Sequence, residues 1–163
     1  MFNKLLYTKE VSVYLKGFIF TCLTFMSFSS FACKCEGLEL NEAFENSKSV
    51  MLVEVISLSL KEAEDDRGVD IFKRKLIEAK FNVIESFKNN EQVSSVVTSS
   101  GNCGIHLYPG QKFVLFVPNS SYFKNYVSTC TGSYGYRGEL SFDDKRFRKL
   151  KEFVYNNTLK QDK

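Results

Sequence analysis

Two long apolar runs near the middle of the chain have the pattern of β-strands. Residues 49–60 (SVMLVEVISLSL) are dense in β-branched and apolar side chains and contain neither Gly nor Pro. Residues 71–87 alternate in their later part, where every second residue from Ala79 to Val83 falls on one face. Both patterns are typical of strands. Because the charged segment between them, residues 61–70, ends in a Gly-containing turn, we expect a long β-ribbon with a solvated tip.

Three shorter runs follow that also have strand composition, the last of them more weakly. They are residues 93–98, 112–117 and 122–128, and Pro109-Gly110 predicts a turn into the second of them. Five strands connected by short turns favour a closed or nearly closed antiparallel barrel. The fold class that we predict is therefore mainly β.

Helical spacing is found on either side of these strands. Residues 38–46 place apolar side chains at helical spacing, which predicts a short helix. In the tail, apolar residues recur every three or four positions after candidate caps at Ser141, Asp143 or Asp144, so we predict an amphipathic helix that packs on the barrel. Lys and Arg residues within 145–151 alternate with apolar ones as on an exposed helix face. The apolar positions of this helix are Phe147, Leu150, Phe153 and Val154.

The first 32 residues have the pattern of a cleavable secretory signal. Three lysines outnumber one glutamate in residues 1–16, and an uncharged apolar run follows at residues 17–31. Ser30-Phe31-Ala32 places small residues at the two positions that a signal peptidase reads, so we expect cleavage after Ala32. Residues 33–163 would then form one exported domain, which we expect to be a monomer and to be secreted or periplasmic.

Two alternatives remain open at this end of the chain. The apolar run is shorter than the roughly 20 residues of a membrane-spanning helix, so we expect no transmembrane segment after signal removal; a retained anchor is the first alternative. A lipid on Cys33 is the second, although bacterial lipoproteins usually carry a branched apolar residue where Ser30 stands.

Charge and the inventory of reactive side chains exclude several functions. The formal net charge of +3 belongs largely to the signal, and no basic patch is interleaved with aromatic residues, so we expect no nucleic-acid partner. His106 is the only histidine, so a histidine-rich metal site cannot be assembled, and we expect this lone histidine to be a structural or surface residue. No phosphate-binding loop, dinucleotide fingerprint or nucleophile elbow occurs, and Gly132-Ser133-Tyr134-Gly135 predicts a turn. We expect neither an enzyme nor a bound cofactor.

Four cysteines remain after the expected cut, and an even number in an exported chain indicates two disulfides. They are Cys33, Cys35, Cys103 and Cys130. A bridge between Cys33 and Cys35 would be strained because one residue separates them, so the two long-range connectivities are favoured and both remain open. The C-x-C motif itself is open to three interpretations: a structural staple, a redox or soft-metal pair, or a family feature.

The cysteine layout is shared with a known family. The C-x-C motif is followed by Asn102-Cys103-Gly104 and then by Val127-Ser128-Thr129-Cys130. Supporting segments are Ala43-Phe44 with Ser49-Val50, residues 81–88 (FNVIESFK) and residues 110–116 (GQKFVLF). Over most of residues 33–130 the sequence resembles the tissue inhibitors of metalloproteinases and the wider netrin-like module.

This resemblance implies a fold, a disulfide pairing and an activity. The fold is a five-stranded barrel of the oligonucleotide/oligosaccharide-binding (OB) type with flanking helices, and the bridges are Cys33–Cys103 and Cys35–Cys130. The activity is inhibition of a zinc metalloprotease, whose zinc is chelated by the α-amino group and carbonyl of Cys33. An α-amine, with a pKa of about 8, is a good zinc ligand once deprotonated. The implied contact ridge comprises Cys33, Lys34, Cys35, Glu36, Ser100, Gly101, Asn102 and Cys103, with Lys34 pointing into the pocket beside the zinc.

Other functions remain open beside this one. Netrin-like modules also occur as plain binding domains, so a non-inhibitory envelope protein that uses the barrel face is the main alternative, and a thiol-redox protein is the third. Lys34 stands where the inhibitors usually carry a small residue, and Glu36-Gly37-Leu38 replaces a proline-bearing segment.

Overall fold

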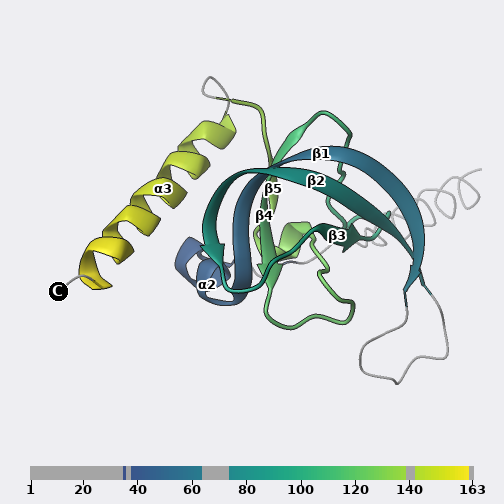
Figure 1. The fold of residues 1–163 in the computed structure, drawn as a ribbon, viewed down its shortest axis with the longest axis horizontal. Coiled ribbons are helices and arrows are strands. Elements are labelled where there is room, and N and C mark those ends of the chain that lie inside the picture. Colours follow the sequence, from purple (N-terminus) through teal and green to yellow (C-terminus); the bar gives the residue numbers. More distant parts are fainter. Residues whose placement is uncertain (1–34, 36–37, 64–73, 139–141, 162–163) are drawn as a thin grey trace, which may run out of the picture. The chain divides into compact units, whose positions relative to one another are not determined.

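The computed structural model describes residues 35, 38–63, 74–138 and 142–161, in which two α-helices, one short 3₁₀ helix and five strands are found (Figure 1). The expected mainly-β class is confirmed. In chain order the elements are α2 (Leu40–Glu45), β1 (Ser47–Ala63), β2 (Arg74–Asn89), β3 (Ser95–Thr98), β4 (Lys112–Pro118), η1 (Thr129–Thr131), β5 (Tyr134–Tyr136) and α3 (Phe142–Gln161).

All five strands belong to one antiparallel sheet in the order β3-β2-β1-β4-β5. The hydrogen-bonded ladders leave this sheet open, because none joins β3 to β5 among the described residues. Two isolated bridges lie between the open edges: a parallel one between Val97 and Tyr126, and an antiparallel one between Gly104 and Ser128. The closed or nearly closed barrel expected from the sequence is therefore not confirmed: the described strands form an open sheet with two single bridges.

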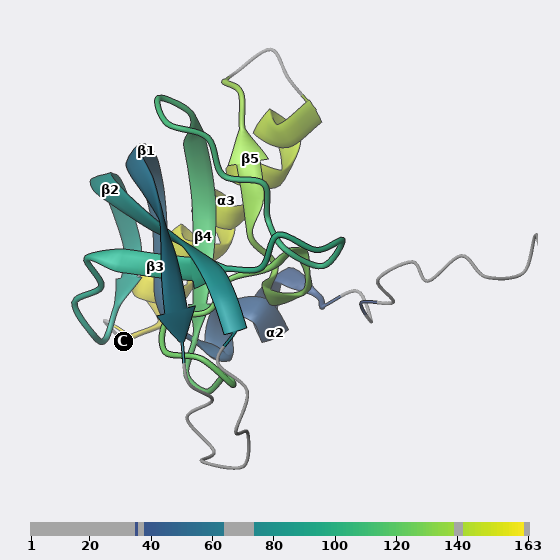
Figure 2. The same cartoon turned by 90° about the vertical axis from the view of Figure 1, so that its right-hand side faces the viewer.

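The ribbon of β1 and β2 is strongly bent, as Figures 1 and 2 show. Its register shifts three times, between Val50 and Met51, between Leu52 and Val53, and around Ile56. Each extra residue bends its strand and increases the local twist. The bulges thus let two long strands curve around a small core.

Alternation along β1 and β4 divides the core into two layers. One layer contains Met51, Val53 and Val55 with Phe113, Leu115 and Val117, and it is covered by Ile105, Leu107 and Val127. The other contains Val50, Leu52, Val114, Phe116 and Tyr134, and it is covered by Ala43 of α2 and by Phe147 and Leu150 of α3. The sheet is therefore buried on both faces over its central strands.

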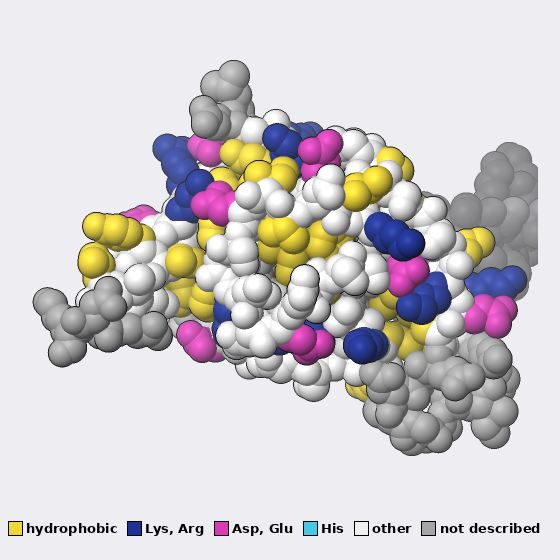
Figure 3. Space-filling view, viewed as in Figure 1, with side chains coloured by type: hydrophobic (Ala, Val, Ile, Leu, Met, Phe, Trp, Pro, Cys, Tyr) yellow, Lys and Arg dark blue, Asp and Glu magenta, His cyan; other side chains and the backbone are white. Residues whose placement is uncertain are grey.

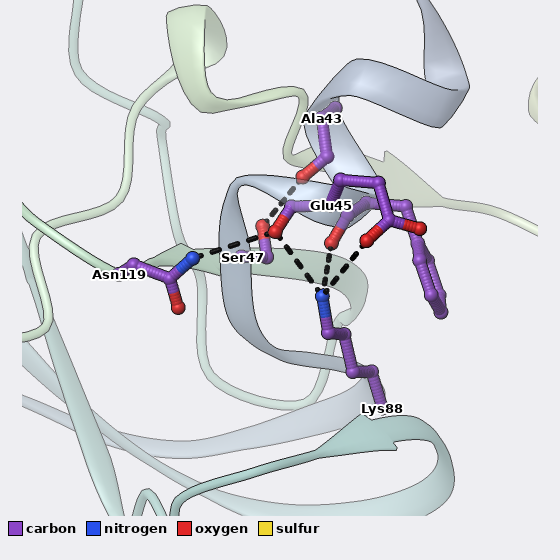
Figure 4. A network of polar contacts seen from close by, with 6 residues as sticks. Ala43, Glu45, Ser47, Lys88 and Asn119 are labelled. Carbon is purple, nitrogen blue, oxygen red and sulfur yellow. Dashed lines mark hydrogen bonds and ion pairs between the residues drawn. The ribbon is translucent and has the colours of Figure 1, made fainter.

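The C-terminal end of α2 is hydrogen-bonded by one side chain at the end of β2 and one directly after β4 (Figure 4). The Lys88 ammonium donates hydrogen bonds to the carbonyls of Phe44 (2.8 Å) and Glu45 (3.2 Å), and the Asn119 amide also donates to the carbonyl of Glu45 (3.4 Å). The last carbonyls of a helix have no partner within it. Lys88 therefore supplies the hydrogen bonds that the N–H groups of a further helical turn would donate to these carbonyls.

The fifth strand lies elsewhere than the sequence predicted. The first four predicted strands correspond to β1–β4, but residues 122–128 form no strand and contribute only the single bridges at Tyr126 and Ser128. Asn125 interrupts the extended run because its φ of 57° is left-handed. The strand that completes the sheet is β5, in a segment whose sequence predicted a turn. Gly132, with a φ of 91°, does make that turn, but the chain is extended again from Tyr134.

Both predicted helices are present. The first spans Leu40–Glu45, and α3 buries Phe147 and Leu150 while its Lys and Arg side chains from 145 to 151 are exposed. The candidate cap Ser141, residues 64–70 of the expected ribbon tip and the expected signal lie outside the described residues. Residues 61–63 of that expected tip belong to β1 instead.

Charges on the face drawn in Figure 3 are mixed: Lys and Arg side chains lie among Asp and Glu, around a central hydrophobic area. No helix within the described residues is both long enough and apolar enough to span a membrane.

Candidate functional site

A disulfide joins Cys35 to Cys130, with their Cα atoms 5.1 Å apart. This is one of the two bridges that the family resemblance implies. Cys130 is in the middle of η1, and the Cys35 sulfur also lies 3.9 Å from the Thr129 hydroxyl oxygen. The chain just before α2 is thereby attached to the short 3₁₀ helix.

The same 3₁₀ helix holds the loop that contains Cys103. The backbone N–H and the hydroxyl of Thr129 both donate to the carbonyl oxygen of Cys103, and each donor–acceptor distance is 3.2 Å. Cys103 is itself disulfide-bonded. Its expected partner Cys33 lies outside the described residues, together with Lys34 and Glu36. Of the expected ridge, the structure therefore brings together Cys35 and the loop of residues 100–103.

Residues 100–103 form an exposed turn on a fixed base. The Gly104 N–H donates to the carbonyl of Gly101 (2.9 Å), which closes the turn. Gly104 also lies so close to the chain of Ser99 that a Cβ would be 1.8 Å from the Ser99 carbonyl oxygen. On the other side, the Tyr126 hydroxyl donates to that of Ser99 (3.1 Å). The loop therefore presents short polar side chains from a tightly packed base.

η1 owes its position to contacts with β4. Ser128 and Thr131 form a capping box at its start, and Gly132 ends it in the left-handed conformation. The buried Ser133 hydroxyl then accepts a hydrogen bond from the N–H of Phe116 (2.9 Å). Cys130 is thus carried by a turn that is hydrogen-bonded directly to a central strand.

Ionisable groups with a shifted pKa lie at another part of the sheet. A hydrogen bond from Lys61 lowers the pKa of Glu78, and a hydrogen bond from Lys48 lowers that of Glu91. Both carboxyl groups are held in their charged form by lysines of β1, which is a structural role. In the part of the chain that is described, no three His, Cys, Asp or Glu side chains group closely enough to hold a metal ion.

An open groove of about 860 Å³ is lined in part by Thr129, the residue of η1 that contacts Cys35 and Cys103. One wall is the segment from Ile105 to Lys112, and the other is β5 with Arg137 and Gly138. Arg146 of α3 also lines it. The sequence pattern does not predict this groove, because residues 132–135 have the composition of a turn. The available signal was the alternation Tyr134-Gly135-Tyr136-Arg137, which a short strand with two aromatic residues on one face would give.

No family model and no curated protein matches this chain.

Proposed function

We propose that this chain is an exported, netrin-like protein-binding module that inhibits a zinc metalloprotease through the α-amino group and carbonyl of Cys33. The observation that carries the proposal is the Cys35–Cys130 bridge at η1, which also holds the carbonyl of Cys103. Cys35 follows Cys33 by two residues, so a covalent anchor lies next to the proposed ligand in sequence. The proposed inhibitor is monomeric and is secreted or periplasmic.

Chelation of the zinc requires that the α-amino group of the N-terminal residue is deprotonated and that the backbone of this residue is held in a fixed position. A catalytic zinc keeps one coordination position for water, and an amine can take it. A ligand whose backbone is fixed before binding loses less conformational entropy on binding. The anchored Cys35 and the exposed residues 100–103 supply such a rigid contact surface.

An OB-type barrel is the architecture that we propose for this module. Two features support it: β1 lies between β2 and β4, and Val97 of β3 pairs in parallel with Tyr126, ahead of β5 in the chain. In that arrangement residues 125–136 would cross from one open edge of the sheet to the other.

The test begins with the mature N-terminus. Intact mass and a non-reducing peptide map of the exported protein should give a chain that begins at an unmodified Cys33. Inhibition is then titrated against a panel of zinc metalloproteases, with a serine protease for comparison. A chain that begins upstream of Cys33, or a lipid on it, would exclude the chelating mechanism.

One added residue provides the decisive variant. An alanine placed before Cys33 moves the α-amine away from the zinc and should abolish inhibition, whereas an alanine added after Lys163 should not change it. Equal inhibition by both variants would refute the proposal.

The lysine at position 34 allows a second test of the same geometry. Burial of its ammonium group in a protease pocket costs free energy, so Lys34→Ser should strengthen inhibition. Lys149→Ser, at an exposed position on α3, is the matched control and should leave inhibition unchanged.

Exposed apolar side chains favour a second candidate, a non-inhibitory binding domain. Ile56, Leu60 and Val83 of the β1–β2 ribbon are 54%, 79% and 52% exposed. If the ribbon is the binding face, Leu60→Glu should weaken partner capture and an alanine before Cys33 should not. The inhibitor proposal predicts the reverse.

A further inference from the structure

The groove beside β5 combines aromatic rings with positive charge; we call it the Tyr–Arg groove. Its tyrosine side chains are Tyr108, which is 54% exposed, Tyr134 and Tyr136. Register pairing between Lys112 and Tyr136 places the start of β4 next to the end of β5 along the same groove. Figure 2 shows the segment that leads into β4 passing beside β5.

The charge of the groove is of one sign among the described residues. Lys112, Arg137 and Arg146 line it, and no described Asp or Glu does. None of these three cations has an ion pair with any carboxylate in the described part of the chain. The described lining of the groove is therefore positively charged, and no described carboxylate offsets that charge.

Arg146 is held in position before any ligand binds. Its guanidinium group donates to the carbonyl of Gly132 (3.0 Å) and lies 4.2 Å above the ring of Tyr134. A guanidinium group has five N–H donors and this hydrogen bond uses one of them. The remaining donors suit a carboxylate, which accepts paired hydrogen bonds from arginine.

The shape of the groove favours a polypeptide as the ligand. β5 pairs with β4, and the five consecutive residues 134–138 line the groove. An extended peptide can follow such a row of residues and alternate its side chains between the two walls. The near-neutral charge of residues 33–163 does not favour a nucleic acid, which needs many phosphate contacts.

We propose that the Tyr–Arg groove binds an extended acidic segment of a partner protein, with Glu or Asp side chains on Arg137 and Arg146 and apolar side chains against Tyr108 and Tyr136. This goes beyond protease inhibition and does not depend on Cys33. Failure of the two proposals can therefore be told apart, because a blocked α-amine would leave this groove intact.

The experiment uses the oxidised protein and a defined probe, the octapeptide (Glu-Thr)₄ with a fluorophore. Binding is followed by fluorescence anisotropy, and the site is mapped by amide chemical shifts. The largest shift changes should fall in residues 105–112 and 134–138. Arg137→Glu should raise the Kd at least about fivefold, since it replaces a charge-assisted contact with repulsion. The same charge change at the exposed Lys149 should raise it less than about twofold.

A second variant pair separates aromatic packing from charge. Tyr108→Ala removes an exposed ring from the groove, and Tyr155→Ala removes one from α3 that is 65% exposed. We expect weaker peptide binding from the first variant only.

Three results would overturn the proposal. The first is shift changes outside the groove, and the second is an equal loss of affinity in Lys149→Glu. The third is binding at the groove by a sulfated tetrasaccharide or by oligo-dT, together with no binding of the acidic peptide.

Discussion

At Gly104 the base of the exposed loop leaves no room for a side chain. We expect Gly104→Ala to lower the free energy of unfolding by about 2–4 kcal/mol, because the new Cβ would overlap the backbone of Ser99. Urea unfolding measures this difference. Gly101→Ala is the matched control in the same turn: nothing lies within 4 Å of its Cβ, and we expect a change below about 0.5 kcal/mol. Similar losses in both variants would mean that the loop is not packed as described.

Glu78 should make the stability of the sheet depend on pH. Its carboxylate accepts hydrogen bonds from Lys61 (3.0 Å) and Ser95 (3.1 Å), and its pKa lies below the ordinary value of 4.5, with the Lys61 hydrogen bond as the largest cause. A carboxyl group with a lowered pKa in the folded state stabilises the fold above the unfolded pKa. This contribution is lost as the pH falls through the folded pKa.

The variant Glu78→Gln tests this dependence through urea midpoints at several pH values. We expect it to be less stable than the wild type at about pH 7 and to approach the wild type at about pH 3. Glu54→Gln, at an exposed β1 position with no ion pair among the described residues, should show no such convergence. A constant difference between Glu78→Gln and the wild type would rule out the charge of Glu78 as the cause.

At the scale of elements, α3 should be attached to the sheet through a few buried side chains. Leu150 is fully buried against the sheet, whereas Leu159 on the same helix is 49% exposed. Leu150→Ala should cost about 2–5 kcal/mol in urea unfolding, because it removes packing and leaves a cavity. Leu159→Ala should cost less than about 1 kcal/mol. If both variants had the same small effect, α3 would not be packed on the sheet.

The elements that could be predicted from the sequence are those whose own residues carry a strand composition or an apolar spacing. The strands β1–β4 and the helices α2 and α3 each carry such a local pattern, so it identified them. β5 has three residues and follows a left-handed glycine, and its pairing with β4 is a long-range contact that no local pattern encodes. Residues 122–128 have strand composition, but Asn125 in a left-handed conformation ends the extended run.

The candidate site was predictable only in part, for a related reason. Cysteine spacing indicated that Cys35 joins a distant partner, and the structure joins it to Cys130. The hydroxyl of Thr129 contacts the Cys35 sulfur and donates to the Cys103 carbonyl. No sequence pattern predicts these contacts, because they depend on where η1 lies in the fold. The Tyr–Arg groove is assembled from three separate segments, so a one-dimensional pattern could not reveal it.

At the scale of the whole molecule, the Cys35–Cys130 bridge should contribute substantially to stability. It spans 95 positions in the sequence. Restricting an unfolded chain over such a loop is worth about 4–5 kcal/mol in the chain-entropy model, and measured values are often lower. The double variant Cys35→Ser/Cys130→Ser should therefore lose about 2–5 kcal/mol in urea unfolding. When both proteins are fully reduced the difference should disappear, and if it persisted the serines themselves would be its cause.

The same bridge determines how the molecule would respond to mechanical tension. α2 and the strands β1–β4 all lie between Cys35 and Cys130 in the chain, whereas β5 and α3 lie after it. A pull between Cys35 and the end of α3 would pass through the covalent bridge, so the chain that the bridge encloses could not be extended. Only β5 and α3 would peel away and extend, by at most roughly 3.6 Å per residue. A partner that tugs on the segment at Cys35 would thus leave four strands of the sheet intact for as long as the bridge stays oxidised.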